Sequence, residues 1–176
     1  MKTIIALLIM TTLASSMRID FGEKSVKNWA VLNDGVMGGL STSQVAFTKS
    51  AMVLKGTVSL ENNGGFASVK SPFEATNLAD YKTVTVRYRS AGQTMALTFE
   101  TSERWYDPTY KAMLPTSKDW STATFELKDF QQYKIGRASG ATMSNQNQED
   151  VIRMGFMTAD KKAGDFMLEV DFLEFN

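Results

Sequence analysis

Residues 29–41, W-A-V-L-N-D-G-V-M-G-G-L-S, combine turn-forming and large apolar residues in one short stretch. The turn formers occupy five of seven consecutive positions, at Asn33, Asp34, Gly35, Gly38 and Gly39. Glycine tolerates positive φ, and Asn and Asp side chains hydrogen-bond nearby backbone groups, so we expect a tight loop. The interspersed apolar residues predict that this loop packs onto a core.

Two interpretations of the loop follow from these residues. In the first, it is a structural corner in which Gly38 and Gly39 adopt positive φ against the core. In the second, Trp29, Asn33 and Asp34 line a surface for a ligand or a protein partner, because loops held by a rigid scaffold often carry function. The pattern leaves both interpretations open.

The chain resembles the complex I intermediate-associated protein 30 family. The resemblance rests on Trp29, on the N-D-G-V-M-G-G-x-S core that follows it, and on G-T-V-S-L at 56–60 and G-G-F-A-S-V at 64–69, where Gly64 and Gly65 form a second strong turn. Later segments keep the order shown by that family, so the resemblance covers nearly all of residues 21–175.

The resemblance implies a fold and a set of functions. The implied fold is all-β, a single galactose-binding-domain-like β-sandwich, or jelly roll, related to carbohydrate-binding modules. It implies no known catalytic centre. The best-known members assist the assembly of respiratory complex I in mitochondria.

Period-2 alternation predicts strands throughout the chain, about eight to ten in total. The clearest run is 83–89, whose outward positions include Arg87 and Arg89. A second run at 95–100 follows a short turn, so we expect the two to be neighbouring antiparallel strands, with Glu100 opposite one of the arginines. A change of apolar phase near Phe172 predicts a bulge in the last strand.

Two segments lack a strand pattern. Residues 102–113 are interpreted as an aromatic-rich loop, and residues 130–147 as a long connection. No run has the length and periodicity of a convincing helix.

Composition excludes several classes of function. The 19 basic and 19 acidic residues cancel, so no strong field attracts nucleic acid. The chain has no cysteine and no histidine, which excludes disulfides, thiolate or histidine metal sites and a Ser-His-Asp triad. A carboxylate pair is the remaining catalytic arrangement, and no nucleophile or metal motif is present. We therefore expect a non-enzyme without a cofactor.

The first 16 residues have the order of a secretory signal peptide. Lys2 is followed by an apolar run and then by Ala14-Ser15-Ser16, which predicts cleavage after Ser16. The domain would then span residues 17–176, in the periplasm or outside the cell. The apolar run is shorter than the roughly 20 residues of a membrane-spanning helix, and no later run approaches that length.

The candidate binding surface combines two groups of side chains. Arg87 and Arg89 share the polar face of their strand, and the rings of Trp105, Tyr106 and Tyr110 follow the next strand. If those strands are neighbours, guanidinium groups and rings meet at one end of a sheet and suit sugar hydroxyls or a peptide carboxylate. The alternative is that the rings cover the edge of the sandwich.

A structural calcium ion is a further candidate. Glu169 and Asp171 alternate toward one side, near Asp20 and Glu23 in the opening strand, and calcium takes carboxylate ligands. The competing interpretation is a solvated charged face, because the spacing is not that of an EF-hand.

The function that follows is a non-catalytic, exported binding module for a carbohydrate or a protein partner. The alternative is an assembly factor, or chaperone, for a membrane or respiratory complex, using the same sandwich face. Location separates the two hypotheses, because an exported protein could not reach the cytoplasmic arm of a bacterial complex I.

Overall fold

The alternating runs of the sequence pair into two antiparallel sheets. The computed structural model describes residues 16–22 and 28–176, so the predicted leader apart from Ser16, and Glu23 of the calcium hypothesis, lie outside the described residues. The strands are β1 (Met17–Asp20), β2 (Ala30–Val31), β3 (Thr42–Phe47), β4 (Met52–Val58), β5 (Ser68–Lys70), β6 (Thr83–Ala91), β7 (Met95–Glu100), β8 (Thr109–Leu114), β9 (Ser121–Glu126), β10 (Gln131–Lys134), β11 (Arg137–Thr142), β12 (Arg153–Thr158) and β13 (Gly164–Phe175).

The helical elements are short and lie between the strands. They are the 3-10 turns η1 (Asp34–Met37), η2 (Glu61–Asn63) and η3 (Leu127–Asp129) and the five-residue helix α1 (Asn145–Glu149). Among the described residues, no helix is long and apolar enough to cross a membrane.

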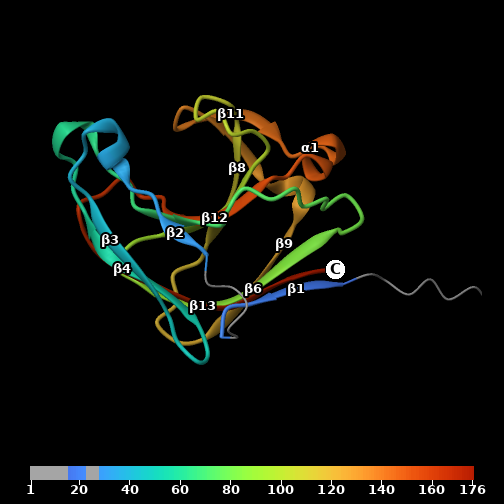
Figure 1. Cartoon of the computed structure of the whole chain (residues 1–176), viewed down its shortest axis with the longest axis horizontal. Helices are drawn as coiled ribbons and strands as arrows, with labels where there is room; N and C mark the ends of the chain where they lie inside the picture. Colours follow the sequence, from blue (N-terminus) through green and yellow to red (C-terminus); the bar gives the residue numbers. More distant parts are fainter. Residues whose placement is uncertain (1–15, 23–27) are drawn as a thin grey trace, which may run out of the picture.

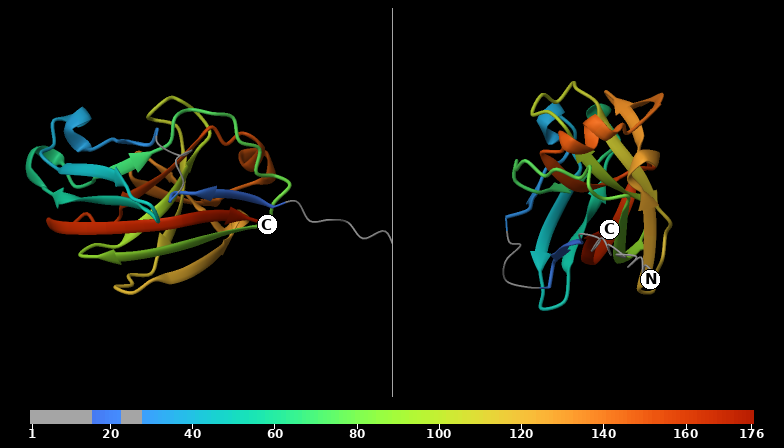
Figure 2. Two further views of the ribbon diagram at one scale, coloured as in Figure 1. Left: turned by 60° about the horizontal axis from the view of Figure 1, so that its bottom comes forward. Right: turned by 90° about the vertical axis from the view of Figure 1, so that its right-hand side faces the viewer.

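The two sheets form a β-sandwich. Sheet A has the order β3-β4-β13-β6-β9, with β1 also paired to β13, and sheet B has the order β11-β10-β8-β7-β12-β5-β2 (Figure 1). The chain passes between the sheets repeatedly, as at β4 to β5, β5 to β6 and β6 to β7. The long strand β13 runs the length of sheet A (Figure 2). This confirms the expected all-β sandwich fold.

The core lies between the inward faces of the two sheets. Leu54, Val86 and Leu168 from sheet A, and Leu97 and Phe156 from sheet B, are fully buried. Each large apolar side chain buried in this way contributes roughly 1.5–3 kcal/mol. The inward residues of both sheets therefore hold the sandwich together.

The predicted pairing of the strands at 83–89 and 95–100 is wrong. β6 pairs with β9 and β13 in sheet A, whereas β7 pairs with β8 and β12 in sheet B. Gly92, at φ 88°, allows the crossing, because a Cβ there would lie 2.1 Å from the carbonyl oxygen of Asp165. Alternation shows that each strand has one buried face, but it does not show which sheet the strand joins.

The described residues contain more strands than the eight to ten expected. The segment 130–147, interpreted as a connection, forms β10, β11 and α1, and the second half of 102–113 forms β8. The edge strand β11 is exposed at every position, so apolar alternation does not reveal it. The predicted bulge is confirmed, since the register of β13 on β6 shifts between Val170 and Phe172.

Candidate functional site

The 29–41 loop is organised around the buried carboxylate of Asp34. This carboxylate accepts hydrogen bonds from the backbone N–H of Ser41 at 3.0 Å and its hydroxyl at 2.5 Å. It also accepts the backbone N–H groups of Gly65 at 2.7 Å and Phe66 at 3.2 Å. Burial raises the pKa of Asp34, but the bonds from Ser41, Gly65 and Phe66 outweigh it, and the pKa lies below its ordinary value of 3.8. Asp34 thus joins two turns that lie side by side in Figure 1.

Two neighbours of Asp34 attach the loop to the sandwich. The side-chain oxygen of Asn33 accepts the hydroxyl of Ser43 in sheet A at 2.7 Å and the backbone N–H of Ser68 in sheet B at 3.3 Å. Trp29 is buried and stacks on Phe156, with ring centroids 6.0 Å apart. The side-chain oxygens of Asn33 and Asp34 are therefore engaged by hydrogen bonds within the protein.

The glycines of the loop meet different structural requirements. Gly38 ends η1 at φ 87°, a conformation that favours glycine. A Cβ at Gly39 would lie 2.5 Å from Cγ of Asp34, and one at Gly64 would lie 2.6 Å from its Oδ2. The expectation of positive φ at both Gly38 and Gly39 therefore holds for Gly38, whereas Gly39 is required by the close approach of Asp34. Gly35 has open space around it.

Arg87 and Arg89 lie on the outward face of sheet A. Arg87 forms an ion pair with Asp171, and Arg89 forms one with Glu169 at 2.8 Å. Both guanidinium groups lie over the ring of Trp120, at 4.8 and 5.2 Å from its centroid. These contacts replace the expected pairing with Glu100 and stabilise neighbouring strands.

The calcium hypothesis does not fit this arrangement. The carboxylates of Glu169 and Asp171 face guanidinium groups that a cation would have to displace. No group of three or more acidic side chains suited to a metal ion occurs in the part of the chain that the structure describes.

The aromatic candidates separate into two environments, neither of them beside Arg87 and Arg89. Trp105 is 75% exposed and Tyr106 43%, and both rings lie in the loop between β7 and β8 of sheet B. Tyr110 is buried on the inward face of β8, where its hydroxyl accepts a hydrogen bond from Gln132 at 3.0 Å. The predicted meeting of the arginines with the rings is therefore wrong, because the two groups belong to different sheets.

A different set of charged residues shares sheet B with the aromatic loop. In the register of β8, β7, β12 and β5, Lys111 lies opposite Thr98, Thr98 opposite Gly155, and Gly155 opposite Lys70. This row is on the outward face, because the alternate residues, such as Leu97 and Phe156, fill the core. Two lysines thus flank two small residues across four strands.

The next row carries the remaining charges. Glu100 of β7 lies opposite Arg153 of β12, with 3.8 Å between their charged groups. Glu100 also forms an ion pair with Lys70. We define Lys70, Glu100, Lys111 and Arg153 as the basic cluster. The cluster contains three cations and one carboxylate, which forms ion pairs with Lys70 and Arg153, and the side chains of these three residues are only 14–18% exposed.

The small residues explain how the cluster forms. A Cβ on Gly155 would lie 3.1 Å from Cγ of Lys70 and 3.0 Å from the hydroxyl of Thr98. The lysine stem therefore lies across the backbone of β12, where a larger side chain would lift it. Thr98 is itself 1% exposed beneath the cluster.

Burial and mutual repulsion shift the protonation of these lysines. Burial, with the charges of Arg153 and Lys111 beside it, lowers the pKa of Lys70 from 10.5 to about 8. Burial also lowers the pKa of Lys111. Glu100 favours the charged ammonium of Lys70 but is shared with Arg153, so the desolvation and repulsion dominate.

Aromatic rings border the basic cluster. Lys111 lies 4.7 Å from the ring centroid of Tyr133, and Arg153 lies 4.3 Å from that of Phe73. Glu100 and Thr109 are the last paired residues before the loop that carries Trp105. The outward face of sheet B therefore combines charged groups with rings at its border.

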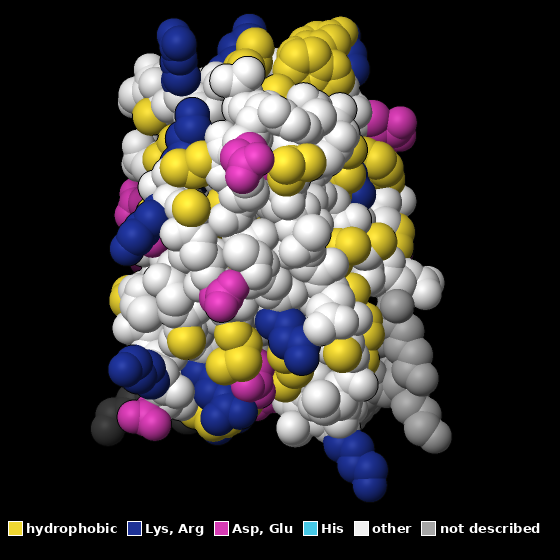
Figure 3. Space-filling model, turned by 90° about the vertical axis from the view of Figure 1, so that its left-hand side faces the viewer, with side chains coloured by type: hydrophobic (Ala, Val, Ile, Leu, Met, Phe, Trp, Pro, Cys, Tyr) yellow, Lys and Arg dark blue, Asp and Glu magenta, His cyan; other side chains and the backbone are white. Residues whose placement is uncertain are grey.

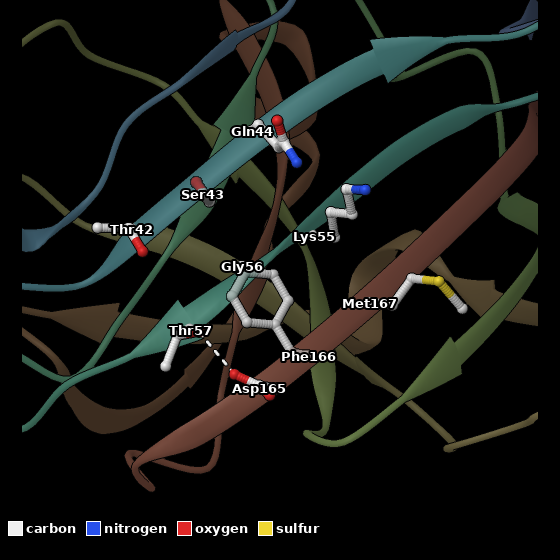
Figure 4. Close-up of a pocket in the computed structure, with 9 residues that line it drawn as sticks. All are labelled: Thr42, Ser43, Gln44, Lys55, Gly56, Thr57, Asp165, Phe166 and Met167. Carbon is white, nitrogen blue, oxygen red and sulfur yellow. Dashed lines mark hydrogen bonds between the residues drawn. The ribbon is translucent and has the colours of Figure 1, made fainter.

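A separate hollow lies over β3, β4 and β13 of sheet A. Its volume is about 540 Å³, and it is lined by Thr42, Ser43, Gln44, Lys55, Gly56, Thr57, Asp165, Phe166 and Met167 (Figure 4). The hydroxyl of Thr57 donates to Asp165 at 2.6 Å, and the ring of Phe166 belongs to the core. Charge is balanced there by one lysine and one aspartate, and the outward residues bring no ring. The surface on this side of the molecule mixes acidic and basic side chains (Figure 3).

Comparison with known proteins identifies the family. The family model described as Complex I intermediate-associated protein 30 matches residues 19–170. The chain belongs to this family. No match was found among the curated proteins.

Solved structures similar to this family member include carbohydrate-binding modules. The family 11 carbohydrate-binding module of cellulase Lic26A-Cel5E from Clostridium thermocellum has a TM-score of 0.67 and 15% identity, over 93% of this chain and 95% of that one. The same module in complex with a β-1,3-1,4-mixed-linked tetrasaccharide gives the same TM-score and identity, over 93% and 96%. The agarase AgWH50C has a TM-score of 0.58 and 11% identity, over 92% of this chain and 24% of its own.

Sequence reasoning missed the basic cluster of this complex I intermediate-associated protein 30 family member. Its residues come from four strands that are dispersed between positions 70 and 153. Each residue of the cluster alternates with core residues along its strand, which indicates that it faces outward. Only the strand order shows that the four residues lie together. The available signal was Lys70 at the end of a buried strand, a position that is unusual for a lysine.

Proposed function

We propose that this protein is a non-catalytic binding module and that the outward face of sheet B binds a carbohydrate. One observation carries the proposal: the loop that holds the exposed rings of Trp105 and Tyr106 joins β7 and β8, the strands that supply Glu100 and Lys111 of the basic cluster. Rings stack on the apolar faces of sugars, and charged side chains hydrogen-bond hydroxyl groups. The sugar-binding modules that share the fold support this class of ligand.

The alternative is an assembly factor or chaperone that holds a protein partner, as the family description suggests. A specific observation favours it. Val36, Met37 and Leu40 around η1 are 51–68% exposed, and Leu60 beside η2 is 47% exposed. Exposed apolar side chains that are fixed by a rigid loop suit a protein interface.

A binding assay with matched lysine variants tests the proposal. Lys111→Met removes one charge of the basic cluster and keeps an apolar stem, and Lys55→Met does the same in the hollow of sheet A. In affinity electrophoresis through a panel of soluble polysaccharides, we expect retardation that Lys111→Met reduces and Lys55→Met preserves. Absence of any retardation, or loss of it only in Lys55→Met, would contradict the proposal.

A matched experiment examines the alternative. Met37→Ser replaces an exposed apolar side chain of η1 and leaves the basic cluster intact. If the alternative holds, Met37→Ser weakens a protein complex captured with the tagged chain, while Lys111→Met leaves that complex unchanged. The opposite ranking favours the face of sheet B.

Export remains part of the proposal. The predicted cleavage after Ser16 would release the module to the periplasm or the medium, where polysaccharides are accessible. The assembly alternative requires instead that the chain stays in the compartment of the complex that it assembles.

A further inference from the structure

The basic cluster has more positive charge than its own residues neutralise. Lys70, Lys111 and Arg153 contribute three positive charges, and Glu100 is the one carboxylate in ion-pair contact with them among the described residues. The whole chain, by contrast, carries no net charge. An excess of two positive charges within one cluster of a neutral protein produces a local potential that attracts anions.

We propose that the ligand of this face is an acidic polysaccharide, whose carboxylate or sulfate groups bind the basic cluster. This inference rests on the proposed function and specifies its substrate class. The shared chemistry of both groups is an oxyanion that accepts hydrogen bonds from ammonium and guanidinium donors.

Geometry supports a repeating anion. The backbone positions of Lys111 and Lys70 are at the two ends of one row, roughly 14 Å apart at about 4.8 Å per strand, and the side chain of Lys70 reaches across β12 to Glu100 of β7. Arg153 lies in the next row. The cluster and its bordering rings cover β5, β12, β7 and β8 together, a width that an extended chain can follow and one compact anion cannot.

Because the cations are partly buried, they interact more favourably with an oxyanion than with water. The cations of the cluster repel one another and have lost part of their hydration, as the lowered pKa values of Lys70 and Lys111 show. An incoming oxyanion supplies the missing countercharge. A neutral polysaccharide gives hydrogen bonds but leaves this repulsion unrelieved.

The test compares polysaccharides that differ in charge on a similar backbone. The probes are polygalacturonate with its methyl ester for the carboxylate arm, and carrageenan with agarose for the sulfate arm. Isothermal titration of the purified protein should give at least one acidic probe an affinity about tenfold above that of its neutral counterpart, which is about 1.4 kcal/mol. The arm that shows the difference identifies the oxyanion.

Variants place the effect on the basic cluster. Lys70→Met and Lys111→Met should each reduce binding of the acidic probe about tenfold, whereas Lys70→Arg keeps the charge and should stay within about threefold. Lys55→Met, which removes a charge on the other sheet, should leave the affinity unchanged. Circular dichroism melting of each variant verifies that it is folded.

The outcomes separate the two proposals. Equal affinity for the acidic and neutral members of both pairs overturns this inference and leaves the proposed function standing. No binding to any polysaccharide overturns both. Polyglutamate that binds as tightly as the acidic polysaccharide also overturns this inference, because charge alone would then explain it.

Discussion

The carboxylate oxygen Oδ2 of Asp34 lies 2.7 Å from the backbone nitrogen of Gly65, 31 residues later in the chain. This bond joins the loop at 29–41 to the turn at η2, and Ser41 completes the group. Asp34 is buried between the two turns, at 1% exposure. Asp34, which the sequence offers as a candidate ligand-binding residue, therefore stabilises the loop.

Asp34→Asn should destabilise the domain. An amide in place of the carboxylate removes the charge and turns an N–H donor toward other donors, and loss of such charge-assisted bonds costs about 2–3 kcal/mol. The free energy of unfolding, from denaturant titration at pH 7, measures the loss. A change below about 0.5 kcal/mol would show that the loop does not depend on this carboxylate.

The same group predicts a dependence on acid. The folded pKa of Asp34 is lowered, so its contribution to stability is present above the ordinary value of 3.8 and is lost as the pH falls through the folded pKa. Melting temperatures between pH 5 and pH 2 should therefore fall less in Asp34→Asn than in the wild type. Parallel curves would contradict the lowered pKa.

Gly39→Ala and Gly35→Ala form a matched pair in the same loop. The new Cβ at position 39 meets Asp34 at 2.5 Å, whereas the one at position 35 meets nothing within 4 Å. We expect Gly39→Ala to cost about 1–3 kcal/mol and Gly35→Ala less than about 0.5 kcal/mol. Denaturant midpoints would show the difference, and equal midpoints would contradict the close packing around Asp34.

Binding of an acidic polysaccharide should weaken at alkaline pH. Lys70 faces Glu100 from β7, Lys111 from β8 and Arg153 from β12, and its pKa is about 8. It is charged below that pH and loses its proton as the pH rises through it, so affinity should fall by up to about tenfold per pH unit. Lys70→Arg stays charged throughout and should give a flatter profile. A steep decline in that variant too would assign the effect to Lys111.

Trp105→Ala should weaken carbohydrate binding without unfolding the protein. The ring is 75% exposed, so the melting temperature should change little, while a lost stacking contact costs more than about 1 kcal/mol of affinity. Trp29→Ala, in contrast, removes a buried ring and should cost about 3–5 kcal/mol of stability. Arg87→Ala, on the outward face of sheet A, should leave affinity unchanged. Weaker binding in Arg87→Ala would move the site to that sheet.

The mature chain should begin at Met17. Ala14 and Ser16 are the small residues that a signal peptidase reads, and β1 begins at the residue after the predicted cut. Intact mass of the protein from the periplasm or medium of its native host measures the start. A mass that includes residues 1–16 would contradict both cleavage and export.

Much of the fold could be predicted from sequence because core residues follow period 2. The run 83–89 is β6, which extends two residues further to Ala91, and the bulge near Phe172 is visible in the sequence as a change of apolar phase. The partner of each strand was not visible, because Val86 in sheet A and Leu97 in sheet B have the same local pattern. The pairing depends on the direction of the chain after the turn at Gly92, where it crosses from sheet A to sheet B, and local alternation does not contain that direction.

The site could be predicted less well for the same reason. Trp105 and Tyr106 are exposed on a loop, as their polar neighbours suggested. Which charged residues share a sheet with these rings depends on the strand order. The sequence therefore suggested Arg87 and Arg89, whereas Lys70 and Lys111 are the residues in the same sheet. The role of Asp34 depends on Gly65 and Phe66, which are distant in sequence and contact it only in the folded structure.

The pairing of Met17 with Phe175 has a consequence for how the domain can be joined to other chains. Both ends of the sandwich leave from neighbouring strands of sheet A, and Figure 1 shows the C-terminus beside β1. A short linker between them should permit circular permutation, and the domain should tolerate insertion into a host loop. Either design would leave the outward face of sheet B uncovered, so a larger enzyme could carry this module.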